Sequence, residues 1–95
     1  MAAPHDLGPF LHAIADPARR RILQALKEPG AGHSEGLCAG DIESRVRLSQ
    51  PTVSHHMKVL EKAGLVEVTR KGTWRWYRRK QKRISQMAGE LKAQL

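Results

Sequence analysis

The chain has 95 residues, with 17 Lys and Arg against nine Asp and Glu, and a formal net charge of +8 at pH 7. A chain of this length forms one small domain with a thin core, and such domains often gain stability by oligomerising. The sequence has no apolar run long enough for a transmembrane helix and no secretory signal at its start, and its single cysteine cannot form an internal disulfide. We therefore expect a cytoplasmic protein that does not bind membranes.

The positive charge is concentrated in the second half of the chain. Residues 1–46 carry five Lys and Arg against six Asp and Glu, whereas residues 47–95 carry twelve against three. A neutral half followed by a basic half indicates one face that binds a polyanion. The alternative is a highly charged, solvated surface without a specific partner.

Two helices are predicted at the start of the chain. Leu7, Phe10, Leu11 and Ile14 recur at helical spacing, in a helix that starts near residues 6–8. In the second helix, Asp16 is a suitable N-cap, Pro17 occupies the first position, and Pro29-Gly30 ends the helix.

The second helix opens with three arginines, Arg19, Arg20 and Arg21. Positive charge at a helix N-terminus opposes the helix dipole. The run therefore indicates a compensating negative group, such as a carboxylate of another subunit or a phosphate, although a solvated face is the favoured interpretation for Arg19 and Arg20.

The middle of the chain predicts a helix-turn-helix at about 39–63. A short helix from Ala39 to Arg45, with Ile42 and Val46 facing inward, precedes a fourth helix that Ser49 caps and Gly64 ends. Residues 66–79 then alternate around Lys71-Gly72-Thr73, which predicts a basic β-hairpin. Trp74 and Trp76 share one strand face, where we expect core or dimer packing, and Tyr77 takes the other.

The last segment, 81–95, predicts an amphipathic helix because Ile84, Met87 and Leu91 fall at helical spacing. The whole chain is therefore predicted to be mainly α with a small β-hairpin. The order α-α-α-α-β-β-α is that of a single winged helix-turn-helix domain spanning 1–95. The second helix of the helix-turn-helix is narrow enough to enter the major groove of double-stranded DNA.

The adjacent histidines of the fourth helix face different surroundings. At about 100° per residue, Val53, Met57 and Leu60 share the inward face. His55 lies nearly opposite, and His56 lies at the edge of the apolar stripe, so the two rings cannot both hold one metal ion. We interpret His55 as a groove-facing residue and His56 as bonded to backbone or phosphate, or simply packed.

The outward residues of this helix and the hairpin cations predict the DNA contacts. The amide, hydroxyl and imidazole groups of Gln50, Thr52, Ser54 and His55 suit base edges, and Ser49 and Lys58 suit phosphates. The hairpin cations can reach neighbouring backbone or the minor groove. The predicted set is Ser49, Gln50, Thr52, Ser54, His55, Lys58, Arg70, Lys71 and Arg75.

Three segments resemble the ArsR-type (ArsR/SmtB) bacterial repressors: ADPARRRIL, LSQPTVSHHMKVLEKAGLV and RKGTWRWYR. The resemblance implies a repressor of transcription that reads an inverted repeat and leaves its operator when a signal arrives. It also implies a homodimer joined through the first and last helices. The apolar residues of those helices are Leu7, Phe10, Leu11, Ile14, Ile84, Met87 and Leu91.

The sequence departs from the metal-sensing members of that family. Their third helix typically starts with Cys-x-Cys, whereas this chain has Cys38 followed by Gly40 at the second thiol position. Residues 80–95 contain neither His nor Asp, the ligands that zinc and nickel sensors carry on the last helix. We therefore expect no metal and no cofactor, and we interpret Cys38 as a buried structural cysteine.

Other functions stay open as alternatives. Cys38 and the histidines could make the repressor responsive to metals or oxidants, or the basic hairpin could bind nucleic acid without sequence preference. An enzyme is not expected because the sequence shows neither paired carboxylates nor a nucleophile with its base. The operator and the inducing signal are not encoded in any recognisable motif.

Overall fold

The computed structural model describes residues 6–27 and 36–95 of the chain. It consists of helices and a small antiparallel sheet, in the order α1 (Gly8–Ala15), α2 (Pro17–Lys27), β1 (Leu37–Cys38), α3 (Ala39–Val46), α4 (Gln50–Lys62), β2 (Val66–Lys71), β3 (Trp74–Arg79) and α5 (Gln81–Gln94). The predicted helices and hairpin are confirmed. The predicted end of the second helix at Pro29-Gly30 lies outside the described residues.

Local capping explains where several of these elements begin and end. The carboxylate of Asp16 accepts hydrogen bonds from the amides of Ala18 and Arg19, at 2.7 and 3.3 Å, as an N-cap should. At the end of α4, Gly64 has a φ of +77°, and the amide of Leu65 donates to the carbonyl of Leu60 at 3.0 Å. This left-handed glycine is the predicted helix stop, and it directs the chain into β2.

The sheet has the strand order β1-β3-β2. In the hairpin, Lys71 pairs with Trp74, so Gly72-Thr73 is a two-residue turn, and Gly72 has the positive φ (+59°) that such turns favour. Strand β1, in which Leu37 pairs with Tyr77 and Cys38 with Trp76, was not predicted from the sequence. A two-residue strand has too few residues to show an alternating pattern, and it exists here only because β3 lies beside it.

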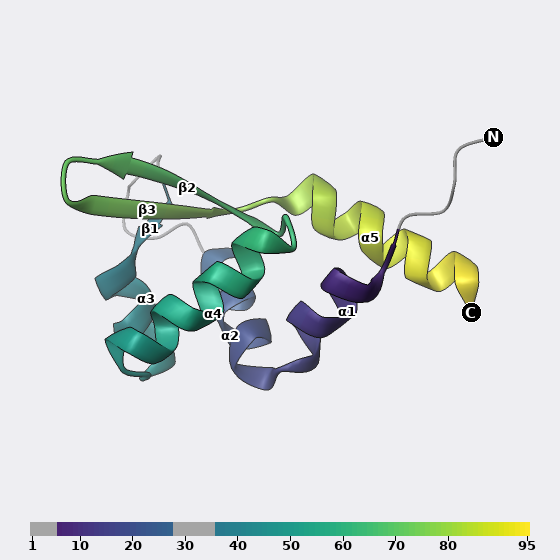
Figure 1. The fold of residues 1–95 in the computed structure, drawn as a ribbon, viewed down its shortest axis with the longest axis horizontal. Coiled ribbons are helices and arrows are strands. Elements are labelled where there is room, and N and C mark those ends of the chain that lie inside the picture. Colours follow the sequence, from purple (N-terminus) through teal and green to yellow (C-terminus); the bar gives the residue numbers. More distant parts are fainter. Residues whose placement is uncertain (1–5, 28–35) are drawn as a thin grey trace.

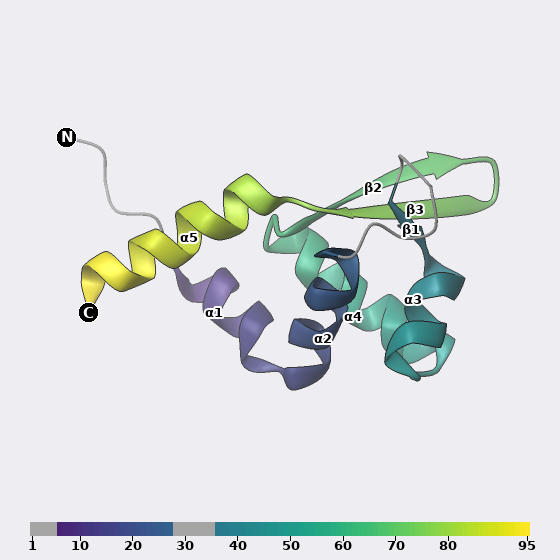
Figure 2. The same cartoon turned by 180° about the vertical axis from the view of Figure 1, so that it is seen from behind.

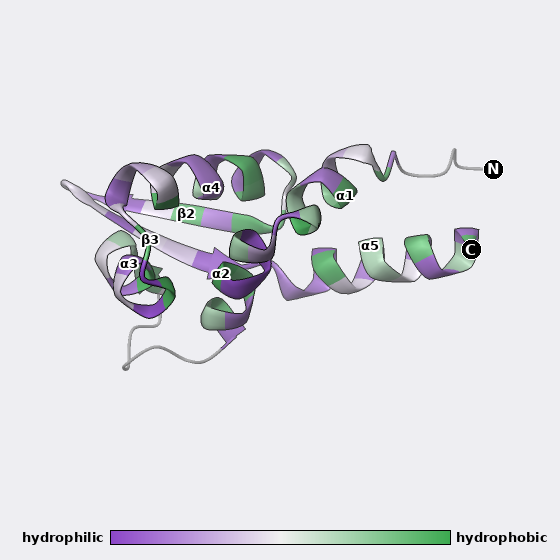
Figure 3. Ribbon diagram, turned by 90° about the horizontal axis from the view of Figure 1, so that it is seen from below, coloured by the Kyte–Doolittle hydropathy of each residue, from purple (hydrophilic) through white to green (hydrophobic). Residues whose placement is uncertain are grey.

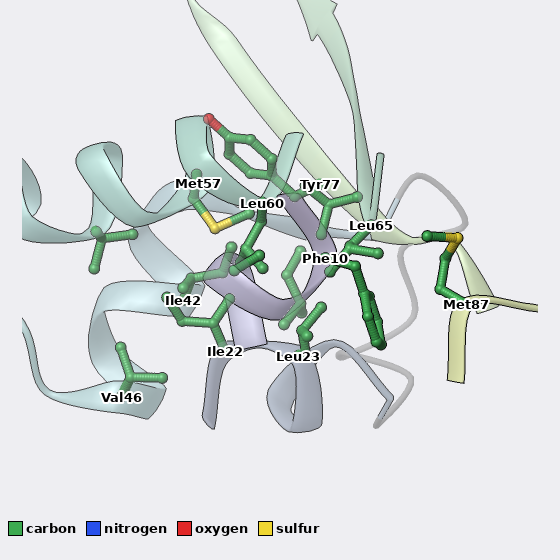
Figure 4. Packing of buried hydrophobic residues seen from close by; sticks show 14 of the residues in the cluster. Phe10, Ile22, Leu23, Ile42, Val46, Met57, Leu60, Leu65, Tyr77 and Met87 are labelled. Atoms are coloured by element: carbon green, nitrogen blue, oxygen red, sulfur yellow. The ribbon is translucent and has the colours of Figure 1, made fainter. Parts of the chain in front are cut away.

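The core lies where α2, α3 and α4 meet the inner face of the hairpin (Figure 4). Ile22, Ile42, Met57 and Leu60 are each at most 1 % exposed, and Tyr77 closes the core from β3. Burying such side chains contributes about 1.5–3 kcal/mol each. The core therefore fixes α4 against the rest of the molecule.

The apolar residues that were predicted for a dimer interface occupy two different environments. Leu7, Phe10 and Met87 are buried within the chain's own core, where Phe10 and Met87 are drawn near each other in Figure 4. Ile14, Ile84 and Leu91 are partly buried at its edge, while Leu11 is 41 % exposed. A stripe of apolar residues at helical spacing does not distinguish burial within one chain from burial between two.

The hairpin and α5 extend from the body in opposite directions (Figures 1 and 2). The hairpin runs above α4 and ends beyond α3, while α5 projects away toward the C-terminus. Hydrophobic and hydrophilic residues alternate along α5 in Figure 3, yet Met87 is its only buried residue. In the described part of the chain, no helix is both long and apolar enough to cross a bilayer.

Candidate nucleic-acid interface

The turn between α3 and α4 is tight and depends on one unusual backbone conformation. Arg47 follows α3 with a φ of +56°, and its amide donates to the carbonyl of Glu43 at 2.8 Å. Ser49 then takes the extended conformation of an N-cap, and its carbonyl accepts from the amide of Val53. No sequence signal marks Arg47 as left-handed, because glycine or asparagine usually occupies such positions.

The inner face of α4 is fixed by burial, as predicted. Val53 and Met57 are 1 % exposed and Leu60 is fully buried. These three residues pack into the core cluster with residues of α2 and α3. Because this face is fixed, the rotation of α4 about its axis is fixed as well, and so is the set of side chains that point outward.

The outer face of α4 carries the predicted reading residues. Gln50, His55 and Lys58 are exposed, whereas Thr52 and Ser54 are half-buried. The hydroxyls of Ser49 and Thr52 lie 2.9 Å apart and hydrogen-bond to each other. Ser49 therefore holds the N-cap position without a side-chain hydrogen bond to the first-turn amides.

The two adjacent histidines have separate environments. Their ring centroids lie 5.6 Å apart, but His55 is exposed and His56 is only 8 % exposed. The Nδ1 atom of His56 lies 3.2 Å from Nη1 of Arg19. The predicted position of His56 at the edge of the core is confirmed, and its partner is a side chain of α2.

The wing formed by β2 and β3 places two arginines side by side. Arg70 and Arg75 are directly opposite each other across the hairpin, and both are exposed. Alternation along the strands puts them on the same face as Val68 and Tyr77, which pack on the body, while Lys71 lies on the other face. Like charges directly opposite each other destabilise a hairpin, and an anion bound between them would remove this repulsion.

A cleft of about 450 Å³ lies between α3, α4 and the wing. Gln50 and Ser54 of α4 contribute to one wall, and Thr73 and Arg75 of the wing contribute to the other. The structure thus brings together predicted contact residues from the helix and the hairpin, which are some 20 residues apart in the sequence. Lys58 lies two turns further along α4 than Gln50.

Cys38 has a structural position at the start of α3. It is half-buried rather than buried as predicted, because its thiol lies at the start of a helix, where it donates to Oδ2 of Asp41 at 3.1 Å within a capping box. Gly40, at the position of the family's second thiol, is exposed. Within residues 6–27 and 36–95, no three His, Cys, Asp or Glu side chains form a group that could hold a metal ion.

The two tryptophans of β3 differ in their exposure. Trp74 and Trp76 stack at 6.1 Å between ring centroids, but Trp74 is 60 % exposed and belongs to no core cluster of the described chain. Tyr77, on the opposite face, is the aromatic residue of β3 that packs in the core. The prediction of core packing is therefore wrong for Trp74, while the alternative of packing in a dimer stays a prediction.

Comparisons of the sequence with known proteins agree with this geometry. A family model described as a helix-turn-helix domain matches residues 14–69. An uncharacterized HTH-type transcriptional regulator of Methanocaldococcus jannaschii is 40% identical over 65 residues, which cover 68% of this chain and 67% of that protein. An arsenical resistance operon repressor of Staphylococcus aureus is 38% identical over 72 residues, or 76% of this chain and 64% of that protein.

Solved structures share the fold over nearly the whole chain. An ArsR family transcriptional regulator superposes with a TM-score of 0.77 at 22% identity, covering 98% of this chain and 90% of its own. A homodimeric winged helix-turn-helix DNA-binding domain from Mycobacterium bovis superposes with a TM-score of 0.64 at 24% identity, covering 98% and 88%. The fold, the outward face of α4 and the sequence relatives lead to one conclusion: the chain belongs to the ArsR-type family of winged helix-turn-helix transcriptional regulators, which bind DNA and are not enzymes.

Proposed function

We propose that the protein is a homodimeric repressor that reads an inverted repeat in double-stranded operator DNA. In each subunit α4 enters the major groove, and the wing contacts the flanking backbone or minor groove. The predicted contacts are Ser49, Gln50, Thr52, Ser54, His55, Lys58, Arg70, Lys71 and Arg75. Repression is the function that the arsenical resistance relative of Staphylococcus aureus carries in its name.

The orientation of α4 is the observation that carries this proposal. Its three core residues are almost fully buried, while Gln50, His55 and Lys58 are exposed on the other side. An amide and an imidazole can hydrogen-bond to base edges, and an ammonium group can bind a phosphate. An exposed polar face on a helix that the core holds rigidly is what direct readout of a DNA sequence requires.

The wing adds a sequence-independent contribution. Arg70 and Arg75 repel each other across the hairpin, and the phosphate backbone of DNA provides the anions that relieve this repulsion. Gln50 and Arg75 line the same cleft, so a duplex could contact both without a rearrangement of the protein. Twelve of the chain's 17 Lys and Arg lie in residues 47–95, which include α4 and the wing.

The homodimer is proposed through α1 and α5. Leu11 of α1 is 41 % exposed, and Leu95, which directly follows α5, is 97 % exposed. In Figure 1, α5 projects from the body, and Met87 is its only buried residue. Two α4 helices related by a twofold axis would read half-sites about one helical turn (10–10.5 base pairs) apart.

Selection of bound duplexes from random-sequence DNA tests the proposal. We expect the selected sites to contain an inverted repeat, and we expect affinity for them to exceed affinity for unrelated DNA by about 10³-fold or more at physiological salt. Sedimentation of the complex should give two chains per site. Equal affinity for selected and unrelated duplexes would instead identify a non-specific nucleic-acid-binding protein and overturn the proposal of a repressor.

A further inference from the structure

Arg19 is a buried cation that joins three helices. It belongs to α2 and is only 7 % exposed. Its Nε donates to the carbonyl of Ala13 at 2.7 Å and its Nη2 to the carbonyl of His12 at 2.9 Å, both in the last turn of α1. Its remaining nitrogen, Nη1, lies 3.2 Å from Nδ1 of His56 on α4. One side chain thus joins the end of α1 to the helix that faces DNA.

Asp16 balances part of the charge of this guanidinium. Its Oδ2 lies 3.9 Å from Nη1 of Arg19, and its Oδ1 caps the start of α2. A buried charge is tolerated only when it is paired and hydrogen-bonded. In the described chain, no fully buried side-chain nitrogen or oxygen lacks a hydrogen-bond partner.

The contact with Arg19 defines the protonation state of His56. A guanidinium can only donate, so Nδ1 of His56 must accept, which requires a neutral ring with its proton on Nε2. Burial lowers the pKa of His56, and the charges of Arg19 and His55 lower it further, while Asp16 acts in the opposite direction. These effects favour the neutral ring that the hydrogen bond requires.

We infer that Arg19 and His56 form a positioning pair that holds α4 in its DNA-reading orientation relative to α1, and that protonation of His56 releases this hold. Once protonated, Nδ1 becomes a donor that faces the donor Nη1 at 3.2 Å, and two positively charged groups are in direct contact. Since α1 belongs to the proposed dimer interface, the pair also connects that interface to the reading helix. The inference rests on the proposed function and adds to it a dependence of operator affinity on pH.

The charged and titratable groups around His56 differ in their expected effect on DNA binding. Arg19 of α2 and Asp16 before it are held in the network just described, and His12 of α1 takes part through its carbonyl. His55, the next residue on α4, is exposed on the DNA-facing side. Protonation of His55 would add a positive charge near phosphates and strengthen binding, so its effect has the opposite sign and must be removed in the test.

The test measures affinity for a duplex selected by the wild-type protein from random-sequence DNA, at pH 7.5 and pH 5.5, in a His55→Asn background. His56→Asn places an amide oxygen near the position of Nδ1 and cannot gain a proton, and His56→Leu removes the acceptor at similar volume. Between the two pH values we expect affinity to fall about tenfold or more with His56 and less than about threefold with His56→Asn. His56→Leu should bind about tenfold more weakly already at pH 7.5.

Circular dichroism melts of each variant at each pH give the folded fraction, and each affinity is calculated from the concentration of folded protein. A merely structural role would lower the melting temperature and leave the affinity of the folded fraction unchanged. Equal pH dependence with His56 and with Asn at this position would overturn the inference, and this comparison holds even if His56→Leu does not fold. If the wild-type protein selects no sequence at pH 7.5, the proposed function fails first; if it selects one and the variants behave alike, only the positioning pair fails.

Discussion

Arg21 of α2 donates a hydrogen bond to the carbonyl of Val46, the last residue of α3. Its neighbours have the same kind of partner, because Arg19 binds the carbonyls of His12 and Ala13 and Arg20 binds those of Ile14 and Ala15. The three arginines therefore bind the C-terminal ends of α1 and α3, where helix dipoles are negative. In the described chain the partners of the three arginines are thus backbone carbonyls, while the predicted carboxylate of another subunit or phosphate stays a prediction. The expectation of a solvated face is wrong for Arg19, which is buried.

Replacing Arg21 by Met tests this capping role. Because Met keeps an apolar stem but cannot donate, we expect the free energy of unfolding to fall by about 1 kcal/mol. Urea unfolding followed by circular dichroism measures it. Arg70→Met in the exposed wing is the matched control and should change the free energy of unfolding by less than about 0.5 kcal/mol. Equal effects of the two substitutions would mean that Arg21 contributes only general charge.

Sequence patterns predicted the elements whose signals are local. Asp16 and Gly64 mark helix ends through their own backbone preferences, and Val53, Met57 and Leu60 mark the inner face of α4 through their spacing. The outward position of His55 followed from the same periodicity. None of these predictions needed knowledge of which segments lie side by side.

Features that depend on contacts between distant residues could not be predicted from sequence patterns. The hydrogen bond between Arg19 and His56 joins residues 37 positions apart. No periodicity encodes such a pairing, so His56 could be placed at the core's edge but not assigned a partner. Strand β1 exists only through its pairing with β3, and Phe10 is buried because α1 folds back onto its own chain. These outcomes are decided by tertiary packing rather than by local preference.

Gly36→Ala should destabilise the protein strongly. Gly36 has a φ of +104°, and a β-carbon at this position would lie 2.1 Å from the carbonyl oxygen of Tyr77. We expect a loss of about 2–4 kcal/mol in the free energy of unfolding, from backbone strain and displacement of β1. Gly40→Ala is the control, because a β-carbon there meets nothing within 4 Å; in a helix this change should stabilise by up to about 1 kcal/mol. Thermal melts that show equal losses for the two variants would contradict the close approach.

His55 and Arg75 should affect DNA binding in different ways. If His55 reads a base edge, His55→Ala costs about 1–3 kcal/mol on the selected duplex and relaxes the preference at one position of each half-site. If Arg75 binds phosphate, Arg75→Gln weakens binding to all sequences about equally and lowers the salt slope by about one for each phosphate that is no longer neutralised. Fluorescence titrations of both variants against selected and unrelated duplexes at several salt concentrations separate the two roles. Loss of sequence preference with Arg75→Gln alone would assign the reading to the wing.

The stability of the protein should decrease in mild acid because of His56. The pKa of His56 is lower in the folded chain than its ordinary value of 6.5. At a pH between these two pKa values, the unfolded chain therefore binds more protons than the folded chain. The free energy of unfolding therefore falls as the pH drops below 6.5, by at most about 1.4 kcal/mol per pH unit for one proton. Asp16 acts in the same direction only at lower pH, because its pKa is lowered from 3.8. Desolvation raises this pKa, but the hydrogen bonds from the amides of Ala18 and Arg19, together with the nearby positive charges, that of Arg19 first, lower it.

Urea unfolding at several values between pH 7.5 and 5.5 measures this dependence, and His56→Asn is the control. As the pH falls, the free energy of unfolding should decrease more for the wild-type protein than for this variant. Parallel curves for the two proteins would show that His56 keeps its ordinary pKa in the folded chain. This measurement concerns stability alone and needs no DNA.

Gly40→Cys should introduce a metal response that the wild-type chain lacks. Cys38 offers one thiol, which donates to Asp41, whereas soft ions such as cadmium or trivalent arsenic bind most tightly to several thiolates. A side chain at Gly40 has free space, and the change restores the Cys-x-Cys spacing of the metal-sensing members. We expect equimolar cadmium to produce thiolate-to-metal absorption with Gly40→Cys and to leave the wild-type spectrum unchanged. Cadmium should also lower operator affinity only in the variant.

Adding Cys38→Ser to the variant should abolish both effects. Release of the wild-type protein from DNA by cadmium, with loss of that release in Cys38→Ser, would instead make Cys38 a sensor in its own right.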